Sequence, residues 1–132
     1  SSVEEGAFLQ CVLGVEISKL VPKHRRGGRV VVGQGDEVVE AGAAAAGEIR
    51  DGLSWFHTPG HAPGHVAVQA ECVDTRLLAV GDTLGPDPAW FREMSAPADL
   101  GNREEHLAAW RMIRGHAPAV VVPGHYAPFA LA

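Results

Sequence analysis

The sequence predicts an α+β domain in which one mostly buried sheet carries helices on its outside. Short apolar runs bounded by glycine or proline recur along the chain and are typical of buried strands; they span residues 29–32, 53–58, 66–70, 76–80 and 119–122. One segment, Asn102–Arg114, has the 3.6-residue spacing of an amphipathic helix. Aromatic residues make up only 6% of the chain, and its many small aliphatic residues favour thin sheets closely covered by helices.

The helix prediction rests on the ends of this segment as well as on its spacing. Asn102 is a favourable N-cap residue, and Glu104 and Glu105 place negative charge in the first turn. Gly115 follows as a helix terminator.

Three other segments are less regular. Phe8–Ile17 is apolar enough for either a strand or a short buried helix. Asp36–Ile49 is rich in alanine and predicts a helix capped by Asp36, although two glycines interrupt it. Gly85–Pro97 contains three prolines and predicts a loop or a broken helix.

Length and charge narrow the classes of function. The 132 residues fit a single domain, and 11 basic against 16 acidic residues give a net charge of −5. This balance argues against a nucleic-acid or anionic-membrane partner. The short basic run at residues 23–26 is predicted to be a solvated turn, with a phosphate or partner contact as the alternative.

The cysteines and the chain start indicate a cytoplasmic protein. Cys11 and Cys72 are far apart and belong to no C-x-x-C pair, which favours two buried thiols in a reducing compartment. No apolar run is long enough to span a membrane, and the acidic start does not have the pattern of a signal peptide.

The richest segment chemically is F-H-T-P-G-H-A-P-G-H, residues 56–65. His57, His61 and His65 are spaced by four, which would align them on a helix, but the two Pro-Gly pairs between them exclude a helix. We therefore expect a strand that runs into a rigid loop. A rigid loop holds an imidazole with little loss of entropy, as a metal site requires.

Two further apolar runs end in metal-capable residues. L-L-A-V-G-D ends in Asp82, and V-V-V-P-G-H ends in His125. A histidine or aspartate at the end of a strand is more often a cap or a turn residue, so each is weak by itself. Three such strand ends in order predict a metal site.

The elements T-P-G-H-A-P-G-H, then G-D, then P-G-H, over residues 53–129, resemble the metallo-β-lactamase superfamily, and the V-V-P-G-H-x-x-P-F ending resembles its small domain-containing hydrolases. The resemblance implies that His61 binds one zinc, that Asp82 bridges two zincs and that His125 binds the second. It also implies a hydrogen-bonding role for His65 beside the ligands. Tyr126, next to His125, is as well suited to packing as to catalysis.

The implied activity is hydrolysis of an ester, thioester, lactone or phosphoester by a zinc-bound hydroxide, with Asp82 taking part in catalysis. His57 has no ligand counterpart in the family pattern. His24, His106 and His116 are predicted to be surface or helix-end residues, the last at a helix C-terminus, where positive charge is favourable.

The sequence departs from the family at H-x-H-x-D-H, because no H-x-H occurs in it. Residues 1–132 are therefore expected to be one partial domain, half of the αβ/βα sandwich, that lacks the N-terminal half. Two zincs that share Asp82 would each have only one further ligand from this chain, whereas a catalytic zinc takes about three. We therefore expect this fragment to be inactive alone, with one zinc held jointly by His61, Asp82 and His125, two zincs in a complemented site, or none. An exposed apolar face would favour a homodimer or a complementing half.

Two readings of function stay open at this stage. One is a zinc hydrolase whose remaining ligands lie elsewhere. The other is a non-catalytic half-domain that acts as a binding or regulatory partner. The substrate is not readable, and Gly85–Asp99, with Trp90 and Phe91, is either a substrate loop or an apolar cover of the core.

Overall fold

The computed structural model describes residues 23–32, 37–50, 52–71, 76–84, 88–118, 120–123 and 129–130, which form two sheets and three helical segments. The smaller sheet is antiparallel and consists of β1 (Lys23–Arg26), β2 (Arg29–Val32) and β3 (Glu37–Glu40). The larger sheet has the order β4 (Ala46–Arg50), β5 (Leu53–His57), β6 (Val66–Glu71), β7 (Arg76–Gly81), β8 (Val120–Pro123) and β9 (Phe129–Ala130). The helical segments are the 3₁₀ turn η2 (Asp82–Leu84), α2 (Pro88–Glu93) and α3 (Arg103–Gly115).

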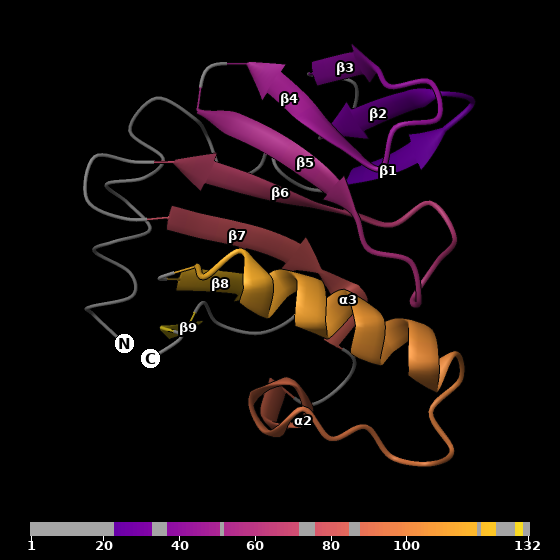
Figure 1. The fold of residues 1–132 in the computed structure, drawn as a ribbon, viewed down its shortest axis with the longest axis vertical. Helices are drawn as coiled ribbons and strands as arrows, with labels where there is room; N and C mark the ends of the chain where they lie inside the picture. The colour runs from indigo at the N-terminus through magenta and orange to yellow at the C-terminus, as the bar shows by residue number, and fades with distance from the viewer. Residues whose placement is uncertain are drawn as a thin grey trace.

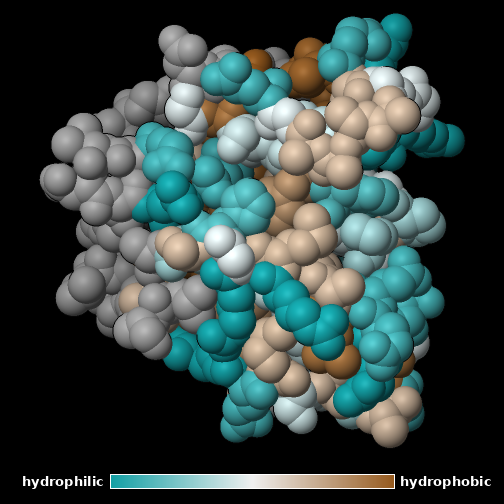
Figure 2. Space-filling view, viewed as in Figure 1, coloured by the Kyte–Doolittle hydropathy of each residue, from teal (hydrophilic) through white to brown (hydrophobic). Residues whose placement is uncertain are grey.

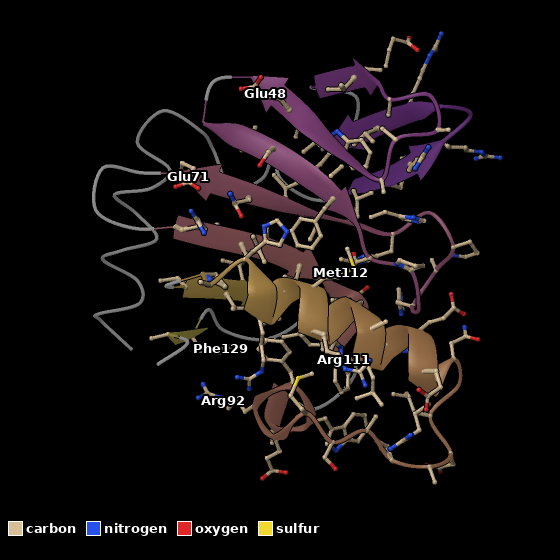
Figure 3. The ribbon with its side chains drawn as sticks, in the orientation of Figure 1. Glu48, Glu71, Arg92, Arg111, Met112 and Phe129 are labelled. Carbon is tan, nitrogen blue, oxygen red and sulfur yellow. The ribbon has the colours of Figure 1, made fainter. Side chains whose placement is uncertain are left out.

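The helices lie on one face of the larger sheet, with α3 across β7 and β8 (Figure 1). The core on this side joins sheet and helix residues, among them Phe56, Leu78, Phe91, Trp110 and Val121. Arg92 of α2 lies 4.4 Å from the centre of the Phe129 ring (Figure 3), which ties α2 to the edge strand β9. Hydrophilic residues cover much of the outer, helix-bearing face (Figure 2).

A second core lies on the opposite face of the larger sheet. It joins Val30 and Val32 of β2 to alternate residues of β5, β6 and β7 such as Trp55, Val68 and Leu77. The central strands therefore bury both faces, which explains why their sequences are continuous apolar runs rather than alternating ones.

This second core corrects one expectation. An exposed apolar face was predicted, but Val66, Val68, Leu77 and Ala79 on this face are each 0% exposed. Among the described residues the only large hydrophobic side chains that are well exposed are Val38 and Met112. The described part of the fold also holds a second small sheet beside the single expected one.

The five predicted strands are confirmed as β2, β5, β6, β7 and β8, and the predicted helix is confirmed as α3. Gly85–Pro97 contains the short helix α2, so the broken-helix alternative is confirmed. Pro88 stands at the first position of α2, where its missing N–H costs no hydrogen bond. Phe8–Ile17 lies outside the described residues.

The helix predicted for Asp36–Ile49 is wrong. Residues 37–40 form β3, which pairs with β2 through valines on both strands, and residues 46–50 form β4 on the larger sheet. Gly42 turns the chain between them with φ +57. Gly47 lies against the indole of Trp55, where a Cβ would come within 2.9 Å of Nε1. Cross-strand packing outweighs the local helix preference of alanine here.

The basic run 23–26 is not a turn but strand β1, and the turn itself is Gly27-Gly28, both with positive φ. The Arg25 guanidinium donates hydrogen bonds to the carbonyls of Gly42 and Ala44 and lies 5.9 Å from the Trp55 ring centre. Arg25 therefore joins the two sheets. In the described part of the chain, no helix has the length and apolar character to cross a bilayer.

Candidate metal centre

Three strands of the larger sheet end at the same edge. β5 and β7 are each antiparallel to β6 and so run in the same direction, and β8 is parallel to β7, with Pro123 beside Gly81. The loop 58–65 and the η2 turn therefore leave the sheet at one edge, and β8 ends there too. This is the arrangement in which strand-terminal side chains converge.

At this edge His61 and Asp82 meet, with His61 Nε2 3.5 Å from Asp82 Oδ2. Their side chains are 49% and 36% exposed, so the pair is open to solvent. Two ligands at Zn–N and Zn–O lengths of about 2.1 Å in a tetrahedral site are about 3.4 Å apart. The observed separation therefore matches two adjacent ligands of one zinc. It also suits a weak surface ion pair.

The loop that carries His61 is held from both sides at its two motif glycines. Gly60 has φ +143 and packs on α3, so close that a Cβ would lie 3.2 Å from the backbone nitrogen of His106. Gly64 packs on β1, where the Arg25 N–H donates to the Gly64 carbonyl at 2.7 Å. A Cβ on Gly64 would overlap the Arg25 carbonyl oxygen. Close backbone approach therefore requires glycine at position 64, and the positive φ together with a tight contact favours glycine at position 60.

Hydrogen bonds inside the loop restrain it further. His57 Nε2–H donates to the Pro63 carbonyl at 2.6 Å, because a carbonyl only accepts. The Thr58 hydroxyl is hydrogen bonded with Nδ1 of the buried His65 at 2.8 Å. The His61 and His65 rings are 6.0 Å apart and nearly perpendicular. His57 therefore braces the loop, and His65 is a buried hydrogen-bonding neighbour of His61.

His106 was predicted to be a surface or helix-end residue; it lies in the first turn of α3 but is not at the surface. It is 5% exposed, and its Nδ1–H donates to the Asn102 carbonyl at 3.1 Å. The ring also meets Trp110 edge-on at 6.1 Å. In the first turn of α3, His106 packs on Gly60 of loop 58–65, so this residue is covered by a segment that is distant in sequence.

His116 lies at the C-terminal end of α3, as predicted, but positive charge is not favoured on its ring. Its ring stacks on Phe56 at 4.0 Å, and its Nδ1–H donates to Gln69 Oε1 at 2.8 Å. Burial, and then the charge of Arg76, lower the pKa of His116 below its ordinary value. Arg76 in turn donates to Glu71. Glu71 lies at the end of β6 (Figure 3). The neutral imidazole is favoured in spite of the helix C-terminus.

The donor chemistry of the site fits zinc, since imidazole nitrogen and carboxylate oxygen are both common zinc ligands. Within the described residues, however, no group of three or more metal-capable side chains comes together. His61 and Asp82 supply two donors. His125 and Tyr126, the other predicted residues at this edge, lie outside the described residues.

Sequence reasoning missed three residues of α3 that shape the site. The Asn102 amide donates to the Gly60 carbonyl at 3.0 Å, His106 packs on Gly60, and the Trp110 indole donates to the Thr83 carbonyl at 2.6 Å. These contacts join residues that are 27 or more positions apart in the chain. The spacing within the helix does not reveal them.

The sequence was compared with known families and proteins. Residues 11–125 match the family model of the metallo-β-lactamase superfamily, which covers most of the chain. No curated protein shows significant similarity to the chain. The predicted resemblance and the α+β fold class are confirmed by this match and by the mixed sheets with flanking helices. The chain belongs to the metallo-β-lactamase superfamily, whose fold is that of metal-dependent hydrolases.

Proposed function

We propose that the protein is a zinc-dependent hydrolase that acts on an ester, thioester, lactone or phosphoester bond, with His61, Asp82 and His125 as ligands. The observation that carries this proposal is the 3.5 Å separation of His61 Nε2 and Asp82 Oδ2 at the shared strand edge. Membership of the superfamily supports the reaction class.

The chain's own residues would serve this function in distinct ways. His61 offers Nε2 from a loop that is braced at both glycines, so little freedom is lost when it binds. Asp82 offers its carboxylate from the start of η2, directly after the buried strand β7. His65 stays buried and hydrogen bonded behind them. The chemistry that zinc supplies in such a place is polarisation of the substrate oxygen and a lowered pKa of water.

The open side of the pair gives a substrate access. About half of the His61 side chain and a third of the Asp82 side chain are exposed, whereas the residues beneath them, such as Thr83, are fully buried. A substrate in solution can therefore reach the exposed side of His61 and Asp82. Selectivity among substrate classes would come from the segments that surround this edge.

We also propose that further ligands come from outside the 132 residues, through a complementing N-terminal half or a homodimer. The family element H-x-H-x-D-H does not occur in the sequence. Two zincs that share Asp82 would each have only one further ligand from this chain, His61 or His125, whereas a catalytic zinc takes about three. The net charge of −5 and the isolated cysteines favour a cytoplasmic protein with no nucleic-acid or membrane partner.

The competing proposal is a non-catalytic binding or regulatory half-domain that holds one metal or none. The observation in its favour is that the described residues bring together no group of three metal-capable side chains. In this case the His61–Asp82 contact is a solvent-exposed ion pair of small energetic value.

The test is zinc affinity and stoichiometry of the chain purified without chelator, measured by competition with a chromophoric chelator. We expect His61→Ala and Asp82→Asn each to weaken zinc binding at least tenfold. Asp99→Asn removes an exposed carboxylate elsewhere and should leave the affinity unchanged. Equal affinities in all three variants would reject the site.

Hydrolysis then separates the two proposals. The zinc-loaded chain, alone and with a complementing H-x-H-x-D-H polypeptide, is assayed on ester, thioester, lactone and phosphoester substrates. Turnover that depends on both zinc and Asp82 supports the hydrolase. Zinc binding without turnover in either form supports the binding or regulatory protein.

A further inference from the structure

Helix α3 contacts both turns that carry the described donors. At its N-terminal end, which lies beside the loop between β5 and β6 (Figure 1), the Asn102 amide donates to the Gly60 carbonyl at 3.0 Å. Farther along, the Trp110 indole donates to the Thr83 carbonyl at 2.6 Å. Gly60 directly precedes His61, and Thr83 directly follows Asp82.

We propose that α3 sets the distance between His61 and Asp82, with Asn102 as the positioning residue of His61 and Trp110 as that of Asp82. The inference rests on the proposed metal site and adds residues to it that touch neither metal nor substrate. A helix suits this task because it is stiff, and the two anchors, eight positions apart, are separated by about 12 Å along its axis.

The geometry of Asn102 shows that its side chain serves the loop rather than the helix. It occupies the N-cap position of α3 but has a left-handed backbone, φ 56 and ψ 37, and makes no side-chain capping hydrogen bond. Its amide is directed instead to the Gly60 carbonyl. An N-cap side chain that gives up the usual cap leaves the helix less stabilised, so the contact with Gly60 is the role that remains.

The Gly60 carbonyl belongs to the peptide bond between Gly60 and His61, so the orientation of this carbonyl determines the position of the His61 Cα and therefore of its side chain. Gly60 has no side chain to restrain it, and its φ of +143 is open to glycine but strained for other residues. Its restraints come from α3: the Asn102 amide holds the carbonyl, and the His106 backbone packs on the Cα. Loss of the amide releases one of these two restraints.

Trp110 holds the Asp82 turn from the interior. The indole is 0% exposed and meets the rings of Phe91 and His106 edge-on at 6.5 and 6.1 Å. These neighbours hold the direction of its N–H. The acceptor, Thr83, is also 0% exposed. No water competes for this hydrogen bond, and the η2 turn is tied to the same helix as loop 58–65.

The test compares Asn102→Asp and Asn102→Gly. The aspartate keeps the size of the side chain and presents two acceptor oxygens to the Gly60 carbonyl, so the hydrogen bond is lost. Its negative charge by itself would raise zinc affinity and, near a helix N-terminus, stability. Glycine removes the amide without backbone strain. Both variants should weaken zinc binding about three- to tenfold, the range for one hydrogen bond.

Thermal midpoints and a metal-free readout separate positioning from general stability. We expect Asn102→Asp to keep the melting temperature of the original protein while hydrogen exchange in residues 58–65, measured by mass spectrometry without zinc, becomes about three- to tenfold faster. Trp110→Phe, which keeps an aromatic ring but no N–H, should weaken zinc binding by a similar factor. Glu105→Gln changes an exposed charge on the same helix turn and should leave both readouts unchanged.

The outcomes are distinct. If both Asn102 variants retain the zinc affinity and the exchange rate of the original protein, the inference is overturned while the His61 site stands. If the original protein binds no zinc through His61, the proposed function fails, and the exchange rates still decide the role of Asn102. A uniform fall in stability with unchanged affinity and loop exchange would leave α3 only a structural role and would also reject the inference.

Discussion

The close approach between Gly64 and strand β1 predicts that Gly64→Ala destabilises the protein. A Cβ at this position would overlap the Arg25 carbonyl oxygen, which is backbone and has no side-chain freedom to move away. Relief of such an overlap costs about 1–3 kcal/mol. It would also stretch the Arg25 N–H bond to the Gly64 carbonyl, now 2.7 Å, whose loss costs about 0.5–1.5 kcal/mol.

One effect acts in the opposite direction. Alanine restricts the unfolded chain more than glycine does and so favours folding by about 0.4–1 kcal/mol. The net prediction is a loss of about 2 kcal/mol in the free energy of unfolding. For a chain of this length this is roughly a 6–10 °C lower melting temperature. Urea unfolding followed by circular dichroism, with a thermal scan beside it, measures both quantities.

Gly115→Ala is the matched control, because it adds the same methyl group at a helical position with nothing within 4 Å of the new Cβ. It should stabilise the protein by up to about 1 kcal/mol. A Gly64→Ala variant that melts at or above the original temperature would refute the close-packing explanation of the Pro-Gly-His motif.

Three further predictions concern the core, pH and surface charge. Leu78→Ala removes a fully buried side chain between sheet and α3 and should cost about 2–5 kcal/mol in urea unfolding; a cost below 1 kcal/mol would contradict the described core. Because burial and Arg76 lower the pKa of His116 below its ordinary 6.5, the unfolded chain takes up this proton at a higher pH than the folded one. Stability should therefore decrease as the pH falls below about 6.5, and His116→Asn should flatten that slope in unfolding curves taken from about pH 5 to about pH 7.5, whereas equal slopes would reject the assignment. Arg29→Ala breaks an ion pair with Glu40 whose side chains are 61% and 78% exposed, so the urea midpoint should shift by less than the equivalent of about 0.5 kcal/mol.

The sequence determined where most elements lie and which family they form. The runs at 29–32, 53–58, 66–70, 76–80 and 119–122 became strands, as expected for short apolar runs with glycine or proline turns nearby. The 3.6-residue spacing of the apolar residues in 103–115 was likewise sufficient to predict helix α3. The rigid motif at residues 58–65 identified the superfamily, since its glycines and prolines restrict the backbone locally.

Contacts between distant segments decided the rest. The alanine-rich stretch 37–50 favours a helix locally, but pairing with β2 and β5 makes it two strands. The burial of His106 depends on the distant loop that packs on it, and the stacking of His116 on Phe56 depends on its position beside the sheet. The sequence predicts Asn102 as a helix cap, but its side-chain amide donates a hydrogen bond to the Gly60 carbonyl instead.

The candidate metal ligands show the same division. His61 and Asp82 could be proposed from the sequence because each follows an apolar strand, in order with His125, in a pattern that resembles the superfamily. The 3.5 Å separation of His61 and Asp82 could not, since it depends on the order β5-β6-β7 and on α3 behind both turns. Local sequence sets which side chains are offered, whereas long-range packing sets the distances between them.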